Sequence, residues 1–207
     1  MPTYRTPDVY VEEISVFPPS VAEVATAVPA FIGYTAKATR DIEGDLKNVP
    51  TRITSLLEFE QLFGGAPTLD VAKVQLDEGG NFVRAELGTG NAKHLYNSMR
   101  LFFDNGGGPC YIVSVGKYTD SVDQNVLITG LGKVATVDEP TILLAPDAAS
   151  LSTDNLAAFQ KAALAQCGKL GDRVALMDTV YYDNKTAHAT AVEDFRSKVG
   201  INSLKYG

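Results

Sequence analysis

The sequence predicts an α/β protein in which buried strands alternate with amphipathic helices. Two observations lead to this prediction. Apolar runs of strand length recur along the 207-residue chain, and the segments between them repeat apolar residues every three or four positions, as on one face of a helix. In the last third, the order strand, helix, strand, helix is typical of parallel strands joined by right-handed crossovers.

Residues 1–20 are predicted to be an extended arm and linker. The residues Val9–Val11 are β-branched or aromatic, as strands favour. Pro7 and the pair Pro18-Pro19 hold the backbone extended, and the prolines lack the Asn-Gly or Asp-Gly chemistry of a tight hairpin. Such a strand can join its own sheet through a longer connection, or it can complete the sheet of a neighbouring molecule. The residues alone leave both readings open.

Residues 21–135 are expected to form a first α/β region. The run 28–35 is apolar on both faces, which predicts a strand in the middle of a sheet, and residues 49–53 predict a shorter one. Ser55 and Glu58 have the spacing of a capping box and predict the start of a helix that ends at the following glycine pair.

Three further elements complete this first region. Residues 66–91 mix charges with glycines and predict an irregular surface excursion, with a short strand near Phe82. Residues 92–104 have helical spacing, and His94 is expected on the exposed side of that helix. The glycine-rich "NGGGP" ends the helix, and "CYIVSV" is a buried strand.

Residues 136–207 are expected to begin a second α/β unit. "TILLAP" and "RVALMD" are strands, and a helix capped at Ser152 or Thr153 lies between them. "TAHATAVEDFRSKVG" is a second helix, and a further strand is expected to start near "SLKYG". The unit is expected to be truncated.

Composition and charge exclude some classes of function. The net charge of −7 and the lack of a Lys/Arg patch argue against nucleic-acid binding. The apolar runs are far shorter than the roughly 20 residues of a bilayer-spanning helix, so direct membrane insertion is not expected. The first residues have no apolar signal region, which predicts a chain made as a soluble cytoplasmic protein.

The residues offer little chemistry for a catalytic or metal site. Cys110 and Cys167 stand far apart in apolar contexts, which favours buried thiols, and the two histidines lack partners at ligand spacing. No phosphate-binding loop and no nucleophile elbow occur. Asp147 and Asp178 follow predicted strands, where a catalytic carboxylate could sit, although Asp is also a common cap and loop residue. We therefore predict no catalytic residue, no metal site and no cofactor. The alternative is an α/β enzyme or small-ligand-binding protein that uses these two aspartates.

Four stretches, "YRTPDVYVEEI", "TAVPAFIGYT", "ITSLLEFEQLFGG" and "LFFDNGGGPCYIVSV", occur in this order over most of the first half. Together they resemble the tail-sheath proteins of contractile phage tails and injection particles, and the residues are more similar to those of the antifeeding-prophage branch. Asp8 departs from the glycine that usually follows the proline of the first motif. The resemblance implies that residues from about Pro140 onward begin a subtilisin-like α/β domain. It also implies that the family's C-terminal, tube-gripping domain is missing from this chain.

The resemblance assigns a role to the arm. In the family it adds as a strand to the sheet of a neighbouring subunit, where main-chain hydrogen bonds hold the junction. The arm residues carried over are Tyr4, Thr6, Pro7, Val9, Tyr10, Val11, Glu12, Glu13 and Ile14. The hinge or linker residues are Phe17, Pro18, Pro19 and Ser20.

The implied function is that of a structural sheath subunit. It would polymerise helically around an inner tube and contract to drive that tube through a target envelope, without enzyme activity. The implied partners are neighbouring copies, the inner-tube protein, and the baseplate and terminal cap proteins. The particle would assemble in the bacterial cytoplasm and become part of a phage tail or be released. A third reading is a non-contractile, self-associating protein that shares only the arm.

Overall fold

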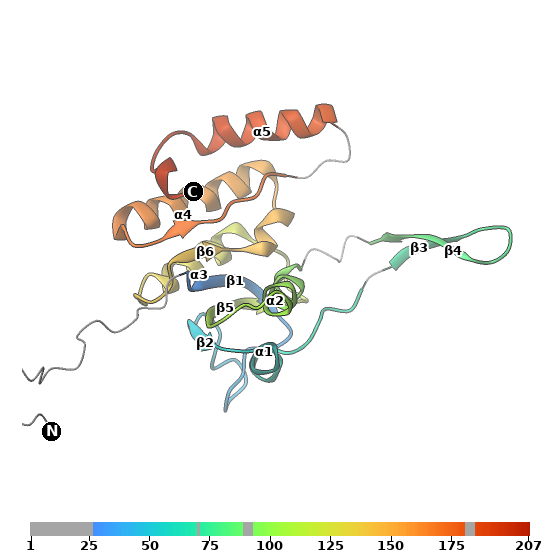
Figure 1. The fold of residues 1–207 in the computed structure, drawn as a ribbon, viewed down its shortest axis with the longest axis horizontal. Coiled ribbons are helices and arrows are strands. Elements are labelled where there is room, and N and C mark those ends of the chain that lie inside the picture. Colours follow the sequence, from blue (N-terminus) through green and yellow to red (C-terminus); the bar gives the residue numbers. More distant parts are fainter. Residues whose placement is uncertain (1–26, 70, 89–92, 181–184) are drawn as a thin grey trace, which may run out of the picture.

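The computed structural model describes residues 27–69, 71–88, 93–180 and 185–207. Its body is a five-stranded sheet in the order β2-β5-β1-β6-β7 (Figure 1). All neighbouring pairs are parallel except β2 and β5, which are antiparallel. The strands are β1 Pro29–Thr35, β2 Thr51–Ile53, β5 Cys110–Lys117, β6 Ile142–Leu144 and β7 Val174–Ala175. The α/β class is therefore confirmed, whereas the finer subtilisin-like topology stays a prediction.

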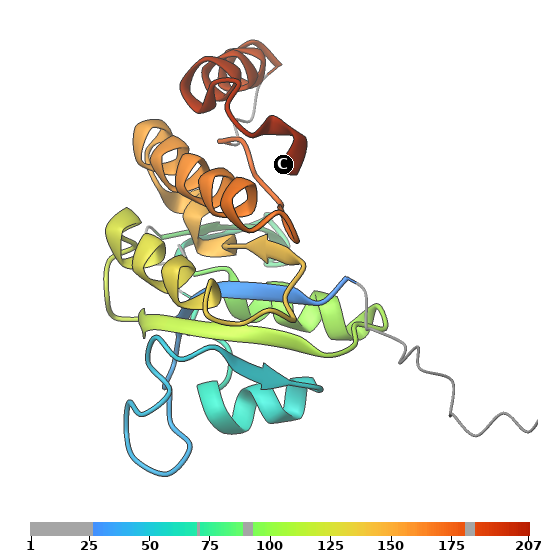
Figure 2. The ribbon, with the colours of Figure 1, turned by 90° about the vertical axis from the view of Figure 1, so that its left-hand side faces the viewer.

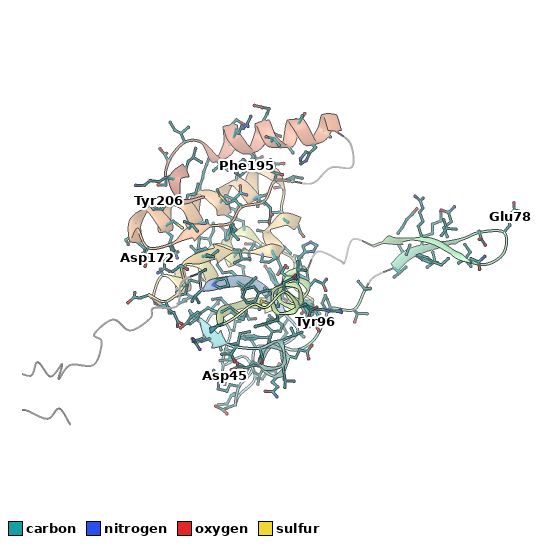
Figure 3. The ribbon with its side chains drawn as sticks, in the orientation of Figure 1. Asp45, Glu78, Tyr96, Asp172, Phe195 and Tyr206 are labelled. Atoms are coloured by element: carbon teal, nitrogen blue, oxygen red, sulfur yellow. The ribbon has the colours of Figure 1, made fainter. Side chains whose placement is uncertain are left out.

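Helices cover both faces of this sheet. The α-helices are α1 Leu56–Phe63, α2 Leu95–Asp104, α3 Gln124–Val134, α4 Thr153–Leu170 and α5 Lys185–Val199, and the 3₁₀ helices are η1 Pro146–Ser150 and η2 Leu204–Tyr206. One core lies between the sheet and helices α3 and α4, and a second lies between the sheet and α1 and α2. Helix α5 lies on the outer side of α4 (Figures 2 and 3), and its residues Val199 and Phe195 pack with Ala157 and Leu164 of α4.

Strand β1 lies at the centre of the sheet, as its sequence predicts. All seven of its residues are buried. Side chains alternate along the strand, so Ile32 and Tyr34 enter the α3/α4 core while Phe31 enters the α1/α2 core. A strand covered on both faces needs apolar residues at consecutive positions, which is the pattern that the run 28–35 has.

The predicted side-chain cap is present at α1, whereas at α4 Ser152 stands at the N-cap position without a side-chain cap hydrogen bond. The Ser55 hydroxyl accepts a hydrogen bond from the Glu58 amide at 3.2 Å. The Glu58 carboxylate accepts one from the Thr54 amide at 2.8 Å, one residue earlier than in a standard capping box. Helix α1 ends at Gly64, whose φ of 85° closes the last turn, and helix α4 begins after Ser152.

The predicted boundary at residues 135 and 136 lies between α3 and β6. Strands from both sides of it share one sheet, because β6 pairs with β1 through Pro29–Phe31. The boundary therefore does not separate two sheets, and the division into domains stays a prediction. Near the end, the expected strand is wrong: residues 204–206 form η2, a short 3₁₀ helix.

The predicted irregular excursion at 66–91 is also wrong in its main part. Strands β3 Val71–Leu76 and β4 Phe82–Leu87 pair antiparallel as a separate two-stranded sheet, here called the hairpin, residues 71–87. The expected strand near Phe82 is confirmed as β4. The hairpin projects away from the body, with Glu78 at its tip (Figures 1 and 3).

Candidate functional site

The first candidate site is the carboxyl edge of the sheet between β1 and β6. Strand β5 lies on one side of β1 and strand β6 on the other, so the chain changes sides of β1 between β5 and β6. Open α/β sheets bind ligands at such a switch point, outside the carboxyl ends of the strands. The sequence analysis places Asp147 here, and the structure confirms that it directly follows β6 in η1.

Asp147 is turned inward and holds three elements together. Its side chain has 0% exposure. One carboxylate oxygen accepts from the Tyr34 amide at 2.6 Å, and the other accepts from the amides of His94 and Leu95, the latter at 3.1 Å. Burial raises the pKa of Asp147, while these amides and the nearby Lys93 act in the opposite direction.

This arrangement has a direct chemical consequence. The amino end of a helix with free amides is a ready site for an anionic ligand group. Here the chain's own Asp147 carboxylate lies at the amino end of α2 and accepts those amides. Asp147 is therefore a buried cap that joins η1, β1 and α2.

A buried lysine completes the same cluster. Lys93 is only 7% exposed; its ammonium donates to the Asp120 carbonyl at 2.5 Å and lies 3.9 Å from the centre of the Tyr34 ring. Burial lowers the pKa of Lys93, while Asp147 and Asp120 oppose that shift. The Tyr34 hydroxyl in turn accepts from the Asp123 amide at 2.9 Å. The cluster links β1 to the loops on both sides, and its polar groups are bound to one another.

Asp178, the second predicted carboxylate, lies in different surroundings from the buried Asp147. It is exposed, and its backbone carbonyl accepts from the Gln160 amide group at 2.6 Å. Its surroundings are a shallow depression of about 450 Å³ that it shares with His94, Ser98 and Thr179. The structure therefore does not bring the two strand-end carboxylates together as a pair.

One polar pair beside this depression was not predicted. The Nε2 atom of His94 lies 3.2 Å from the Ser150 hydroxyl. The two residues are 56 positions apart in sequence, so spacing gave no signal for this contact. Within the described residues, no carboxylate is hydrogen-bonded to the His94 ring, so the pair is not part of a Ser-His-Asp triad.

The cysteines are buried free thiols, as their contexts predict. Burial raises the pKa of Cys110 to about 12 and that of Cys167 to about 11. Neither thiol is therefore activated as a nucleophile or metal ligand at neutral pH. Across the part of the chain that the structure describes, His, Cys, Asp and Glu side chains do not gather in threes as metal ligands. No described helix has the length and apolar character needed to cross a bilayer.

The glycine-rich run after α2 forms one wall of a groove. As predicted, it closes the helix, with the Asn105 amide bonded to the Leu101 carbonyl at 3.2 Å and the Gly107 amide to the Phe102 carbonyl at 2.9 Å. The groove, here called the α2 groove, has a volume of about 920 Å³. Its apolar lining residues are Ala27, Val28, Phe31, Leu101, Phe102, Pro109 and Leu144.

The predicted arm and hinge residues, from Tyr4 to Ser20, lie outside the described residues, so their role stays a prediction. Two exposed apolar surfaces were not predicted: the α2 groove and the hairpin. The hairpin had a signal in the alternation of polar and apolar residues from Lys73 to Leu76. The groove had none, because its lining residues come from distant parts of the chain.

No protein-family model and no curated protein matches the chain by sequence. Among solved structures, the chain is similar to the cryo-electron microscopy structure of the anti-feeding prophage helical sheath in its contracted state. The identity is 24% and the TM-score 0.50, over 89% of this chain and 42% of that one. The chain thus spans less than half the length of the protein it matches. At this identity the likeness concerns architecture: the chain shares the fold of a contractile-sheath protein.

Proposed function

We propose that the chain is a structural subunit of a contractile sheath, which polymerises helically around an inner tube and contracts to drive that tube through a target envelope. The observation that carries the proposal is the shared fold with the contracted anti-feeding prophage sheath over 89% of the chain. The four sequence stretches that resemble sheath proteins support it independently, since they were identified from residues and not from the fold.

The site chemistry also supports a mechanical role without catalysis. The buried Asp147 carboxylate occupies the position at the amino end of α2 where α/β proteins often hold an anionic ligand. The rival reading, an enzyme or small-ligand protein that uses Asp147 and Asp178, needs both carboxylates at one accessible site. Burial of Asp147 counts against it.

The mechanism on this proposal is a change of packing. Subunits assemble in an extended lattice, and a trigger at the baseplate lets them repack into a shorter and wider state with more buried contact. The N-terminal arm, residues 1–20, adds as a strand to a neighbouring sheet, so that subunits stay joined while they rotate and slide. No cofactor or nucleotide takes part.

The proposed partners follow from this mechanism. They are neighbouring copies of the chain, the inner-tube protein, and the baseplate and terminal cap proteins. The particle assembles in the bacterial cytoplasm and serves as part of a phage tail or as a released extracellular particle.

The test is electron microscopy of the full-length protein expressed with its inner-tube protein, with and without residues 1–16. We expect ordered tubes or rings with the intact protein and none after the deletion. A matched pair of point variants refines the result: Val11→Pro removes a backbone donor from the arm and should block assembly, whereas Val11→Thr keeps a strand-favouring residue and should not. Separate globular particles from both the intact and the shortened protein would refute the proposal.

A further inference from the structure

The hairpin has two chemically different faces. On one face Lys73 lies opposite Glu86, and Gln75 lies opposite Arg84. The Arg84 guanidinium donates to the Gln75 side chain at 3.0 Å and to the Glu86 carboxylate at 2.8 Å. Gln75, Arg84 and Glu86 of this face therefore bind one another along the hairpin itself.

The opposite face is apolar, and the described residues of the chain leave it largely exposed. Because successive side chains point to opposite sides of a strand, Val74, opposite Ala85, and Leu76, opposite Phe82, share this second face. The exposed fractions are 53% for Val74, 55% for Leu76 and 67% for Phe82. Val74, Leu76, Phe82 and Ala85 are called here the hairpin apolar face.

Such a face needs a partner. An isolated two-stranded hairpin is at best marginally stable in water, and antiparallel sheets with one apolar face ordinarily pack that face against another layer. An exposed apolar patch on a projecting element is also typical of a surface that binds another protein. The described residues of its own chain therefore supply no second layer for the hairpin apolar face.

The α2 groove has the complementary chemistry. The described residues that line it include no charged side chain, and Leu101, on its wall, is 67% exposed. Phe102, Phe31 and Leu144 supply further apolar surface. The groove runs along the second half of α2, whereas the hairpin precedes the first turn of that helix in the chain. One molecule thus carries an apolar projection and an apolar groove at two different places.

We propose that the hairpin apolar face of one copy docks in the α2 groove of the next copy. Two different surfaces that complement each other form a head-to-tail contact, and repeated head-to-tail contacts build an open helix when they do not close into a ring. This is the symmetry that a helical sheath needs, so the inference rests on the proposed function and adds a specific contact to it. The polar face of the docked hairpin stays toward solvent.

The direct test is chemical cross-linking between two variants that each carry one introduced cysteine. Copies with Phe82→Cys are mixed with copies with Leu101→Cys, and a bismaleimide with a short spacer is added. The native Cys110 and Cys167 are buried, so the introduced thiols react first. The matched control replaces Phe82→Cys by Gln75→Cys on the polar face of the same hairpin. We expect the yield of cross-linked pairs of unlike copies to be at least about tenfold above that of the control. This is the factor expected when a central interface contact is lost.

A second experiment measures assembly. Leu76→Ser with Phe82→Ser should lower the yield of tubes about tenfold when expressed with the inner-tube protein, because the docking surface loses its apolar contact. Lys73→Ser with Gln75→Ser changes the same strand on its other face and should leave the yield unchanged. Thermal unfolding verifies that the body of each variant is folded.

The outcomes separate the two proposals. If the wild-type protein forms tubes and the apolar-face variant forms them equally well, the hairpin contact is wrong and the sheath function stands. If the wild type forms no tubes or rings, the sheath proposal fails, and the cross-linking result alone decides the contact. Cross-linking of Leu101→Cys to a cysteine at Val9 instead of Phe82 would show that the arm fills the groove and would overturn the inference.

Discussion

The body and the hairpin carry similar apolar residues but differ in whether these residues are buried. Strands β1 and β5 carry apolar side chains that are buried between helices on both faces of the sheet, whereas β3 and β4 carry valine, leucine and phenylalanine that remain exposed. Burial of apolar surface stabilises the body directly, at about 25 cal/mol per Å². The hairpin gains less of this stabilisation from the described residues of its own chain, because Val74, Leu76 and Phe82 stay 53–67% exposed. Its apolar residues therefore serve a contact outside the fold.

The largest expected contrast is in thiol reactivity. At pH 8, burial should slow alkylation of Cys110, whose pKa is raised to about 12, more than about a thousandfold relative to a cysteine introduced by Phe82→Cys. Since the thiolate is the reactive form, the Cys110 rate should keep rising about tenfold per pH unit up to about pH 10, while the Phe82→Cys rate flattens above the ordinary cysteine pKa of about 8.5. Mass spectrometry of iodoacetamide-treated protein measures both sites, and rapid labelling of Cys110 in folded protein would contradict the comparison.

The next effect is on the free energy of unfolding. Phe59→Ala removes a fully buried ring from the α1/α2 core and should destabilise the protein by about 3–5 kcal/mol. Phe82→Ala removes the same ring from the hairpin and should change stability by less than about 0.5 kcal/mol. Urea unfolding followed by circular dichroism tests the pair. Equal losses would mean that the hairpin packs against its own body.

A smaller effect is expected for the strand-end aspartates. Asp147→Ala leaves buried amides without an acceptor and should cost about 2–3 kcal/mol, whereas Asp178→Ala, at an exposed position, should cost less than about 0.5 kcal/mol. The same unfolding measurement compares them. A similar cost for both would show that the cap is not what holds η1 to α2.

Asp147 also predicts a pH dependence. Burial raises its folded-state pKa above the unfolded value of about 3.9, so the folded protein holds this proton more tightly. Its contribution to stability is then fully present below the unfolded pKa and is lost as the pH rises through the folded pKa. Asp147→Asn should remove this slope from the pH profile of the unfolding free energy, and an unchanged slope would assign it to other groups.

The elements that could be predicted from sequence are those with one strong, uninterrupted pattern. Strand β1 is continuously apolar, and α4 repeats apolar residues on one face from Leu156 to Cys167 after a serine at its N-cap position. Helix α3 escaped prediction because two glycines, poor helix formers, interrupt it. Gly130 has a packing reason: a side-chain carbon there would lie only 2.4 Å from Val115 and 3.0 Å from Ile32 in the sheet. A single sequence does not reveal such a close approach.

The candidate site was predictable only in part. That Asp147 and Asp178 follow strands could be read from the sequence, because both stand directly after apolar runs. The sequence could not show which of the two is buried, because burial of Asp147 depends on amides from β1 and α2 that are distant in sequence. The hairpin was missed because a bulge interrupts the register of its strands near Phe82 and because alternation without burial gives a weak signal.

The central place of β1 also governs how the protein can form during synthesis. This strand leaves the ribosome first among the strands of the body, yet its neighbours β5 and β6 come much later, and its contact with Asp147 spans 113 residues. Closing loops of that length before any compensating contact slows folding. The body therefore folds late and as a whole, and its most apolar strand depends until then on whatever shields nascent chains from aggregation.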